Sequence, residues 1–122
     1  MQSYRELVVY RKSYEMAKEI NRIAKEFPED ERYGLASQIK RASTSIPLNI
    51  AEGYGKAERG KEVLRYLSMA RGSSAEMEVL LSFSTDFGYI SEKEYKILIA
   101  RQEEIGRMLT GLMRSLRERE GR

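Results

Sequence analysis

The chain has 122 residues and a mass of 14.2 kDa, which is the size of one ordinary domain. Charged residues make up 34% and hydrophobic residues 41%, a composition typical of a folded protein rather than a disordered one. The absence of Cys excludes disulfides, zinc fingers and iron–sulfur sites, and the absence of His removes the commonest general base and transition-metal ligand. We expect a single domain, residues 1–122, that is not an enzyme and uses no cofactor or metal.

The net charge is +3, and the basic residues are unevenly distributed. The segment 32–61 contains six Lys or Arg residues but only two acidic ones, Glu52 and Glu58. A local excess of this size is compatible with nucleic-acid binding but is not diagnostic of it. No apolar run reaches the roughly 20 residues of a membrane span, and the first twelve residues lack the apolar core of a signal peptide. We therefore expect a cytoplasmic protein.

Two helices are predicted in the first half of the chain, at about 7–27 and 31–53. In the first, the core-facing positions follow a 4-3-4-3-4 spacing, and Phe27-Pro28 ends the helix because a residue before proline disfavours the helical conformation. In the second, Pro47 lies inside the helix and predicts a kink, while Gly34 favours a start several residues after Pro28. The periodic positions are Val9, Ser13, Met16, Ile20, Ile23 and Phe27 in the first helix, and Leu35, Ile39, Ala42, Ile46 and Ile50 in the second.

Two further helices are predicted at about 61–87 and 91–117. Gly88 is expected to cap the third helix, and Ser91 with Glu94 forms a capping box at the start of the fourth. Four amphipathic helices with short connections predict an all-α protein, an antiparallel up-down-up-down four-helix bundle. The periodic positions are Leu67, Ala70, Ser74, Met77, Leu81 and Ser84 in the third helix, and Leu98, Gln102, Ile105, Leu109, Leu112 and Leu116 in the fourth.

The first and third helices carry more apolar residues than one bundle core requires. A bundle helix needs about three apolar positions in seven, whereas apolar residues here point all around both helices. We infer a second buried surface, most simply a self-association interface that makes the protein a homo-oligomer. The additional positions are Leu7, Tyr10, Tyr14 and Ala17 in the first helix, and Val79, Leu80 and Phe83 in the third.

Two short motifs are typical of enzymes, but each has a simpler explanation. Residues 55–61 match G-x-x-x-x-G-K of a P-loop, yet Glu62 follows where a magnesium-binding Ser or Thr is required, and a helix precedes the motif instead of a strand. Ser37 and Lys40 match S-x-x-K, but its companion motifs are missing. We interpret the first as an interhelical loop and the second as two polar helix positions.

Two acidic residues, Glu52 and Glu76, follow runs of small residues, and Arg41 is available to pair with them. We predict that they form a paired, hydrogen-bonded cluster inside the bundle, because buried charges must be neutralised by a partner. Nothing beside them supplies a nucleophile, so the cluster is interpreted as structural.

A basic set in the middle of the chain is the candidate nucleic-acid interface. Such side chains could contact phosphates, with Tyr54 and Tyr66 available to stack on bases, although a solvated helix face also explains the pattern. If subunits form a closed ring, each patch is repeated and the summed field becomes much stronger than that of one chain. The predicted phosphate contacts are Lys40, Lys56, Arg59, Lys61 and Arg65.

The run from Gln38 to Gly53, the segment from Ala70 to Glu76 and the ending from Leu112 to Leu116 resemble a known family. It is the family of four-helix bundle proteins encoded in intervening sequences of 23S rRNA genes. The resemblance covers nearly the whole chain, although Glu58-Arg59-Gly60 stands where the family often has a Ser or Thr cap. The matching motif residues are Arg41, Ser45, Pro47, Asn49, Glu52, Gly53, Gly72, Ser73 and Glu76.

The resemblance implies a ring-like homo-oligomer, typically a pentamer, with no known catalysis, and it implies an architectural role for the motif residues. A related group, the accessory variability proteins of diversity-generating retroelements, binds nucleic acid and a reverse transcriptase. Two functions are therefore expected: nucleic-acid binding through repeated basic patches, or a protein-interaction adaptor such as an accessory subunit of a reverse transcriptase.

Overall fold

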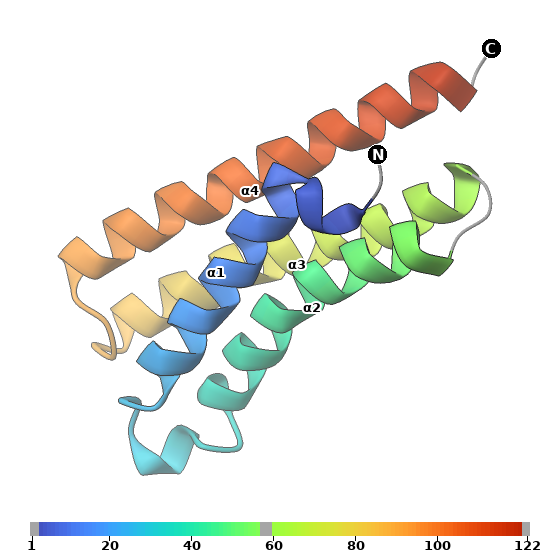
Figure 1. Cartoon of the computed structure of the whole chain (residues 1–122). Coiled ribbons are helices and arrows are strands. Elements are labelled where there is room, and N and C mark those ends of the chain that lie inside the picture. Colours follow the sequence, from blue (N-terminus) through green and yellow to red (C-terminus); the bar gives the residue numbers. More distant parts are fainter. Residues whose placement is uncertain (1–2, 57–59, 121–122) are drawn as a thin grey trace.

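A computed structural model describes residues 3–56 and 60–120 and contains four long α-helices in that part of the chain. They are α1 (Val8–Ala24), α2 (Leu35–Lys56), α3 (Gly60–Asp86) and α4 (Glu92–Glu120), with short 3₁₀ helices η1 (Tyr4–Glu6) and η2 (Glu29–Glu31) before α1 and α2. Each long helix packs against the next one in the chain, and α4 also contacts α1 (Figure 1). The predicted all-α, up-and-down arrangement is confirmed.

Helix α4 extends well beyond the start of α1. An ion pair joins Lys12 of α1 to Glu104 of α4 at 3.1 Å and shows which residues of these two antiparallel helices lie side by side. From that contact α1 continues for only four residues to its start at Val8, whereas α4 continues for sixteen to Glu120. The last turns of α4 therefore lie beside the ends of α2 and α3 that face each other across the 57–59 connection (Figure 1).

The core contains the periodic apolar positions of all four helices. Ile20, Ile50, Leu67 and Leu109 are almost fully buried, and burying each such side chain contributes about 1.5–3 kcal/mol to folding. Met113 occupies the core position assigned above to Leu112, which is half-buried.

Two polar residues of the core are partners of one another. The Gln102 side-chain amide of α4 donates a hydrogen bond of 2.9 Å to the hydroxyl of Ser74 on α3. Both side chains are buried, and the pair links the two helices. The amide oxygen of Gln102 has no partner within the described part of the chain.

The first connection differs from the predicted helix ends. Helix α1 ends at Ala24 instead of residue 27, and the amides of Glu26 and Phe27 form tighter i to i+3 turns. Phe27 still packs in the core, against the ring of Tyr89 at 5.3 Å between centroids. The segment after Pro28 forms only the 3₁₀ turn η2, so α2 begins at Leu35 rather than at residue 31.

Helix α2 continues through Pro47 and past the predicted end at Gly53, as far as Lys56. A Cβ atom on Gly53 would lie 3.0 Å from the Cβ of Tyr66 on α3, so this glycine allows the two helices to approach closely. The packing of α2 on α3 offsets the low helix propensity of glycine. At the other end of the chain, α4 extends three residues beyond the predicted 117, where Arg117 and Arg119 complement the negative end of its dipole.

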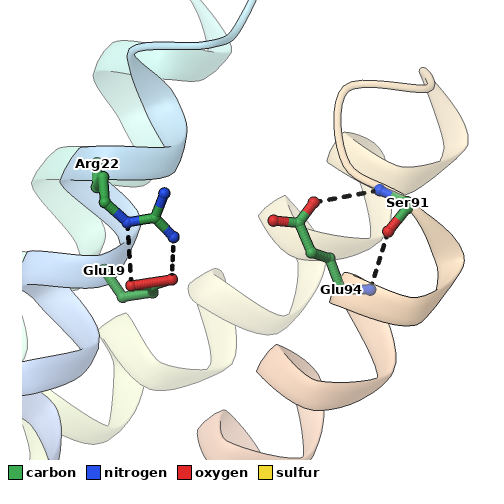
Figure 2. A network of polar contacts seen from close by, with 4 residues as sticks. All are labelled: Glu19, Arg22, Ser91 and Glu94. Carbon is green, nitrogen blue, oxygen red and sulfur yellow. Dashed lines mark hydrogen bonds and ion pairs between the residues drawn. The ribbon is translucent and has the colours of Figure 1, made fainter.

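Both predicted caps around the α3–α4 connection are confirmed. The Glu94 amide donates to the Ser91 hydroxyl at 3.0 Å and the Ser91 amide to the Glu94 carboxylate at 3.5 Å, which is a capping box (Figure 2). Gly88 has φ +82°, and the amides of Gly88 and Tyr89 donate to the carbonyls of Thr85 and Ser84. This hydrogen-bond pattern is a Schellman motif, in which glycine is favoured because other residues are strained at positive φ.

Replacing Gly88 with Ala is expected to lower the free energy of unfolding by about 1–2 kcal/mol, the cost of a Cβ in the left-handed region. Gly111 is the matched control. It is also exposed, with no atom within 4 Å of an added Cβ, but it lies inside α4. Gly111→Ala should raise stability by about 0.5–1 kcal/mol through helix propensity. Urea denaturation measures the free energy of unfolding of both variants. Equal effects of the two substitutions would contradict the assignment of Gly88 as the C-terminal cap of α3.

A carboxylate joins η2 to the α3–α4 connection. Glu31 accepts a 2.7 Å hydrogen bond from the Tyr89 hydroxyl and a 3.0 Å bond from the Leu35 amide, so it caps the start of α2. These two donors, the Leu35 amide first, lower the pKa of the Glu31 carboxyl. A Cβ on Gly34 would come within 2.7 Å of the same carboxylate, which is why a glycine fits at that position.

Replacing Tyr89 with Phe is expected to lower the melting temperature at neutral pH. Because the folded-state pKa of Glu31 is lowered, its stabilising contribution is complete above the ordinary glutamate pKa and is lost as pH falls through the folded value. The difference in melting temperature between the wild type and Tyr89→Phe should therefore become smaller as the pH is lowered from 5 to the lowest pH at which the protein folds. Thermal melts across that range test this, with Tyr33→Phe, at an 87% exposed tyrosine, as the control. A pH-independent difference would contradict the role of the ionised carboxylate.

Candidate nucleic-acid interface

The structure separates the five predicted phosphate contacts. Lys56 at the end of α2 and Lys61 and Arg65 in the first turns of α3 are exposed at the same end of the bundle. Lys40 is exposed but lies sixteen residues before Lys56 on α2, or about 24 Å along the helix axis. Arg59 lies outside the described residues.

Lys40 belongs to a different neighbourhood. It lines a small hollow of about 120 Å³ together with Lys25 and Arg32, near the α1–α2 connection. A single ligand segment on one chain that contacts Lys56 and Arg65 would have to run the length of α2 to reach it. Lys40 therefore does not share one site with Lys56 and Arg65 on a single chain.

The sequence reasoning missed three arginines of the same end of the bundle. Arg114, Arg117 and Arg119 are exposed on the last turns of α4. Burial raises the pKa of Tyr54 on α2. The positive charge of the nearby Arg119 opposes this shift, which shows that the end of α4 lies close to α2. The antiparallel fold thus brings the last turns of α4 beside the end of α2 and the start of α3 (Figure 1).

The two ends of the bundle carry opposite charge. We define the basic end as residues 52–56, 60–75 and 106–119, and the acidic end as residues 25–34 and 84–97. The basic end has eight Lys or Arg residues and three Glu, a net charge of +5, whereas the acidic end has four basic and seven acidic residues, a net charge of −3. The basic residues of the basic end are Lys56, Lys61, Arg65, Arg71, Arg107, Arg114, Arg117 and Arg119.

Next to the acidic end, two charged side chains of α1 are paired with each other. Arg22 of α1 donates two hydrogen bonds to Glu19, one turn earlier, and this pairing lowers the pKa of the Glu19 carboxyl (Figure 2). Glu19 raises the pKa of the Arg22 guanidinium, and the negative charge of Glu94 in the α4 capping box adds to this shift. The net charge of +3 of the whole chain therefore understates the positive field at the basic end.

The predicted buried cluster of Arg41, Glu52 and Glu76 is wrong for the single chain. All three side chains are exposed, and no ion pair joins Arg41 to either carboxylate. The reason is helix geometry: the buried positions around Arg41 are Ile39 and Ala42, and one residue turns a helix by about 100°, so Arg41 points outward.

Other motif residues form the seam between α2 and α3. The Ser73 hydroxyl donates to the Ser45 hydroxyl at 2.9 Å, and the Asn49 amide donates to the Ser45 carbonyl and hydroxyl at 2.8 and 3.0 Å. Pro47 and Gly53 are buried, whereas Gly72 is exposed with no atom near an added Cβ. Apart from Pro47 and Gly53, the motif residues are exposed or partly exposed on α2 and α3, and we call the surface that they form the α2–α3 face.

Part of the surplus apolar surface lies on the same face. Met69 and Phe83 of α3 are 49% and 46% exposed, and Glu76 lies midway between them at heptad spacing. Leu48 of α2 and Val79 of α3 are also exposed. Ala17 and Leu80, by contrast, are buried within the chain itself, so the second apolar surface is smaller than predicted.

A second exposed apolar region lies between α1 and α2. This groove of about 610 Å³ is lined by Tyr4, Tyr10 and Tyr14 on one side and by Pro47 and Leu48 on the other. Lys18, Arg22 and Lys25 of α1 also line it. Such a surface is typical of a protein-binding site.

The P-loop-like motif lies in a different structural context from that of a phosphate-binding loop. Helix α2 includes Gly55 and Lys56, so the P-loop-like segment follows a helix where a phosphate-binding loop follows a strand. Among the residues that the structure describes, no group of three or more acidic side chains could hold a metal ion. No helix in residues 3–56 and 60–120 is both long and apolar enough to cross a membrane.

Comparisons with known proteins agree with the fold and the motif. A search among curated proteins found no match. A crystal structure of a protein of unknown function from Bacteroides thetaiotaomicron, described as a member of the S23 ribosomal protein family, is similar, with a TM-score of 0.81 and 28% identity. The match covers 88% of this chain and 96% of that one. The family model of the 23S rRNA-intervening sequence protein matches residues 5–111, which include every motif residue. The chain belongs to the 23S rRNA-intervening sequence protein family.

Proposed function

We propose that this protein is a non-enzymatic, homopentameric four-helix bundle protein that binds RNA or DNA through basic patches repeated around the ring. The observation that carries the proposal is the basic end, where three helices place eight Lys or Arg residues against three Glu. Phosphate contacts supply most of the affinity of a sequence-independent nucleic-acid binder, and exposed Lys and Arg side chains supply those contacts.

The α2–α3 face supports the self-association part of the proposal. It exposes Met69, Phe83 and Leu48 beside polar groups of both charges, Arg41 and Glu76. Exposed Arg and Glu side chains on one face can pair across copies of the chain, which would give the motif residues an intermolecular role instead of the intramolecular one predicted. A ring built in this way repeats the basic end once per subunit and multiplies its field.

Salt dependence of binding tests the nucleic-acid proposal. A fluorescently labelled structured RNA should bind with an affinity that falls linearly with salt on a log–log plot, with a slope of about −5 or steeper if most of the basic end is engaged. Fluorescence anisotropy between 50 and 300 mM salt measures this slope. A flat dependence, or no binding at 50 mM salt, would refute the basic end as a nucleic-acid interface.

The tyrosine-lined groove between α1 and α2 favours a second candidate function, a protein-interaction adaptor such as an accessory subunit of a reverse transcriptase. The groove combines an apolar lining with basic residues, and none of its lining residues belongs to the basic end. If Tyr14→Ala abolishes capture of a protein partner while RNA affinity is unchanged, the adaptor function gains support. Gene neighbourhood discriminates further, because a flanking reverse transcriptase favours the adaptor.

A further inference from the structure

A groove between α3 and α4 carries charges of both signs. It has a volume of about 640 Å³ and is lined by Arg71 and Glu78 of α3 and by Glu103, Arg107 and Arg114 of α4. Gly106 keeps it open: an added Cβ would lie 3.3 Å from the Ser74 hydroxyl and 3.9 Å from a carboxylate oxygen of Glu78. The Glu78 carboxylate therefore lies over Gly106, on the wall of the groove.

The charges are separated along the groove. Arg71, Arg107 and Arg114 lie toward the basic end, and Glu78 and Glu103 lie on the side away from it. None of these arginines lies within 4.0 Å of a carboxylate of Glu78 or Glu103. Arg71 and Glu78 are seven residues apart on α3, or about 10 Å along its axis.

We infer that the groove binds one unpaired guanine nucleotide of the nucleic acid, with its phosphate on the arginines and its base on the glutamates. This inference rests on the proposed function and specifies the nucleotide that the groove recognises. The spacing of about 10 Å along α3 between Arg71 and Glu78 is comparable with the distance from the phosphate of a nucleotide to the far edge of its base, and Arg107 lies closer to the glutamates, one turn from Glu103 on α4. The open volume of about 640 Å³ accommodates one nucleotide and its hydration.

Guanine is the base that matches a carboxylate. Its Watson–Crick edge presents two adjacent donors, N1–H and N2–H, which a carboxylate accepts as a bidentate pair. Adenine, cytosine and uracil each present an acceptor beside their donor, and an acceptor facing a carboxylate is repelled. The base must be unpaired, because pairing occupies this edge and the groove lies between two helices that a duplex cannot enter.

Binding of free nucleoside monophosphates tests the inference. GMP should bind about tenfold more tightly than AMP, CMP or UMP, and IMP, which lacks the N2 amino group, should lie between them. Chemical-shift titration of the Gly106 and Gly111 amides measures these four affinities and that of IMP. Equal affinities, or shifts confined to residues outside the groove, would overturn the inference.

Variants of the groove separate base recognition from charge. Glu78→Gln with Glu103→Gln should remove the preference for GMP. Arg107→Gln should instead lower the binding affinity of every nucleotide by the same factor. Glu26→Gln with Glu92→Gln adds the same charge on exposed sites outside the groove and should keep the preference. Survival of the preference in the Glu78/Glu103 variant would overturn the inference.

The two proposals fail in different ways. If long RNA binds with the expected salt slope but the four mononucleotides are not distinguished, the guanine site is refuted and the basic end stands. If GMP is preferred but long RNA does not bind, the groove stands and the proposed function fails.

Discussion

Replacing Lys56, Lys61 and Arg65 together with Gln is expected to weaken RNA binding by about a hundredfold or more at 0.1 M salt. Each phosphate contact contributes about 0.9 to the slope of log affinity against log salt, so the slope should become shallower by about three. All three side chains are exposed, so the fold should be unchanged. Anisotropy titrations at several salt concentrations measure both quantities.

The matched control lies at the acidic end. Lys25→Gln with Lys93→Gln and Lys96→Gln removes the same charge from exposed positions on the opposite end of the bundle. It should leave the slope nearly unchanged, because charges more than a Debye length of about 10 Å from the bound strand are largely screened at 0.1 M salt. Equal losses in the two triple variants would show that net charge, and not the basic end, determines binding.

The second large effect is expected on assembly. Met69→Glu with Phe83→Glu places two charges on the exposed apolar stripe of α3. An unpaired charge buried in an interface costs about 3–5 kcal/mol, enough to reduce association by more than a hundredfold per site. The mass in solution should therefore fall to 14.2 kDa, that of one chain, while the circular dichroism spectrum keeps its helical form.

Ile97→Glu is the control for that experiment. Ile97 is 54% exposed, comparable with Met69 and Phe83, but it lies on α4, away from the α2–α3 face. Its substitution should leave the mass unchanged. Dissociation by Ile97→Glu, with Met69→Glu and Phe83→Glu still assembled, would place the interface elsewhere.

The bundle itself could be predicted from the sequence because apolar periodicity and capping chemistry are local signals. Ile39, Ala42, Ile46 and Ile50 are buried as their spacing predicts. The helix ends are predicted less well where tertiary contacts decide. Gly53 is a poor helix former and yet lies inside α2, because its contact with Tyr66 exists only after α2 and α3 pack.

The error at Arg41 has a different origin. The residues that follow it, from Ala42 to Ser45, are small and favour a buried interpretation, but its angular position on α2 places it with Ser45 and Glu52 on the outward side. The sequence does contain a signal for the outward direction of Arg41, namely its angular position relative to the buried residues of the same helix. It outweighs composition because the direction of a side chain is set by its position around the helix axis.

The candidate site could be predicted only in part. Lys56, Lys61 and Arg65 are close in sequence and were found by counting charge along the chain. The contribution of Arg114, Arg117 and Arg119 depends on which helix ends meet, and a linear count does not contain that information. The up-and-down topology does: it places the end of the fourth helix beside the start of the third.

The most direct test of the central claim is the mass of the protein in solution by light scattering, with and without structured RNA, at 50 mM and 500 mM salt. A multimer of the 14.2 kDa chain whose mass increases with RNA at low salt only is the predicted result. A multimer whose mass is unchanged by RNA at 50 mM salt would contradict nucleic-acid binding, and a 14.2 kDa monomer would contradict the ring.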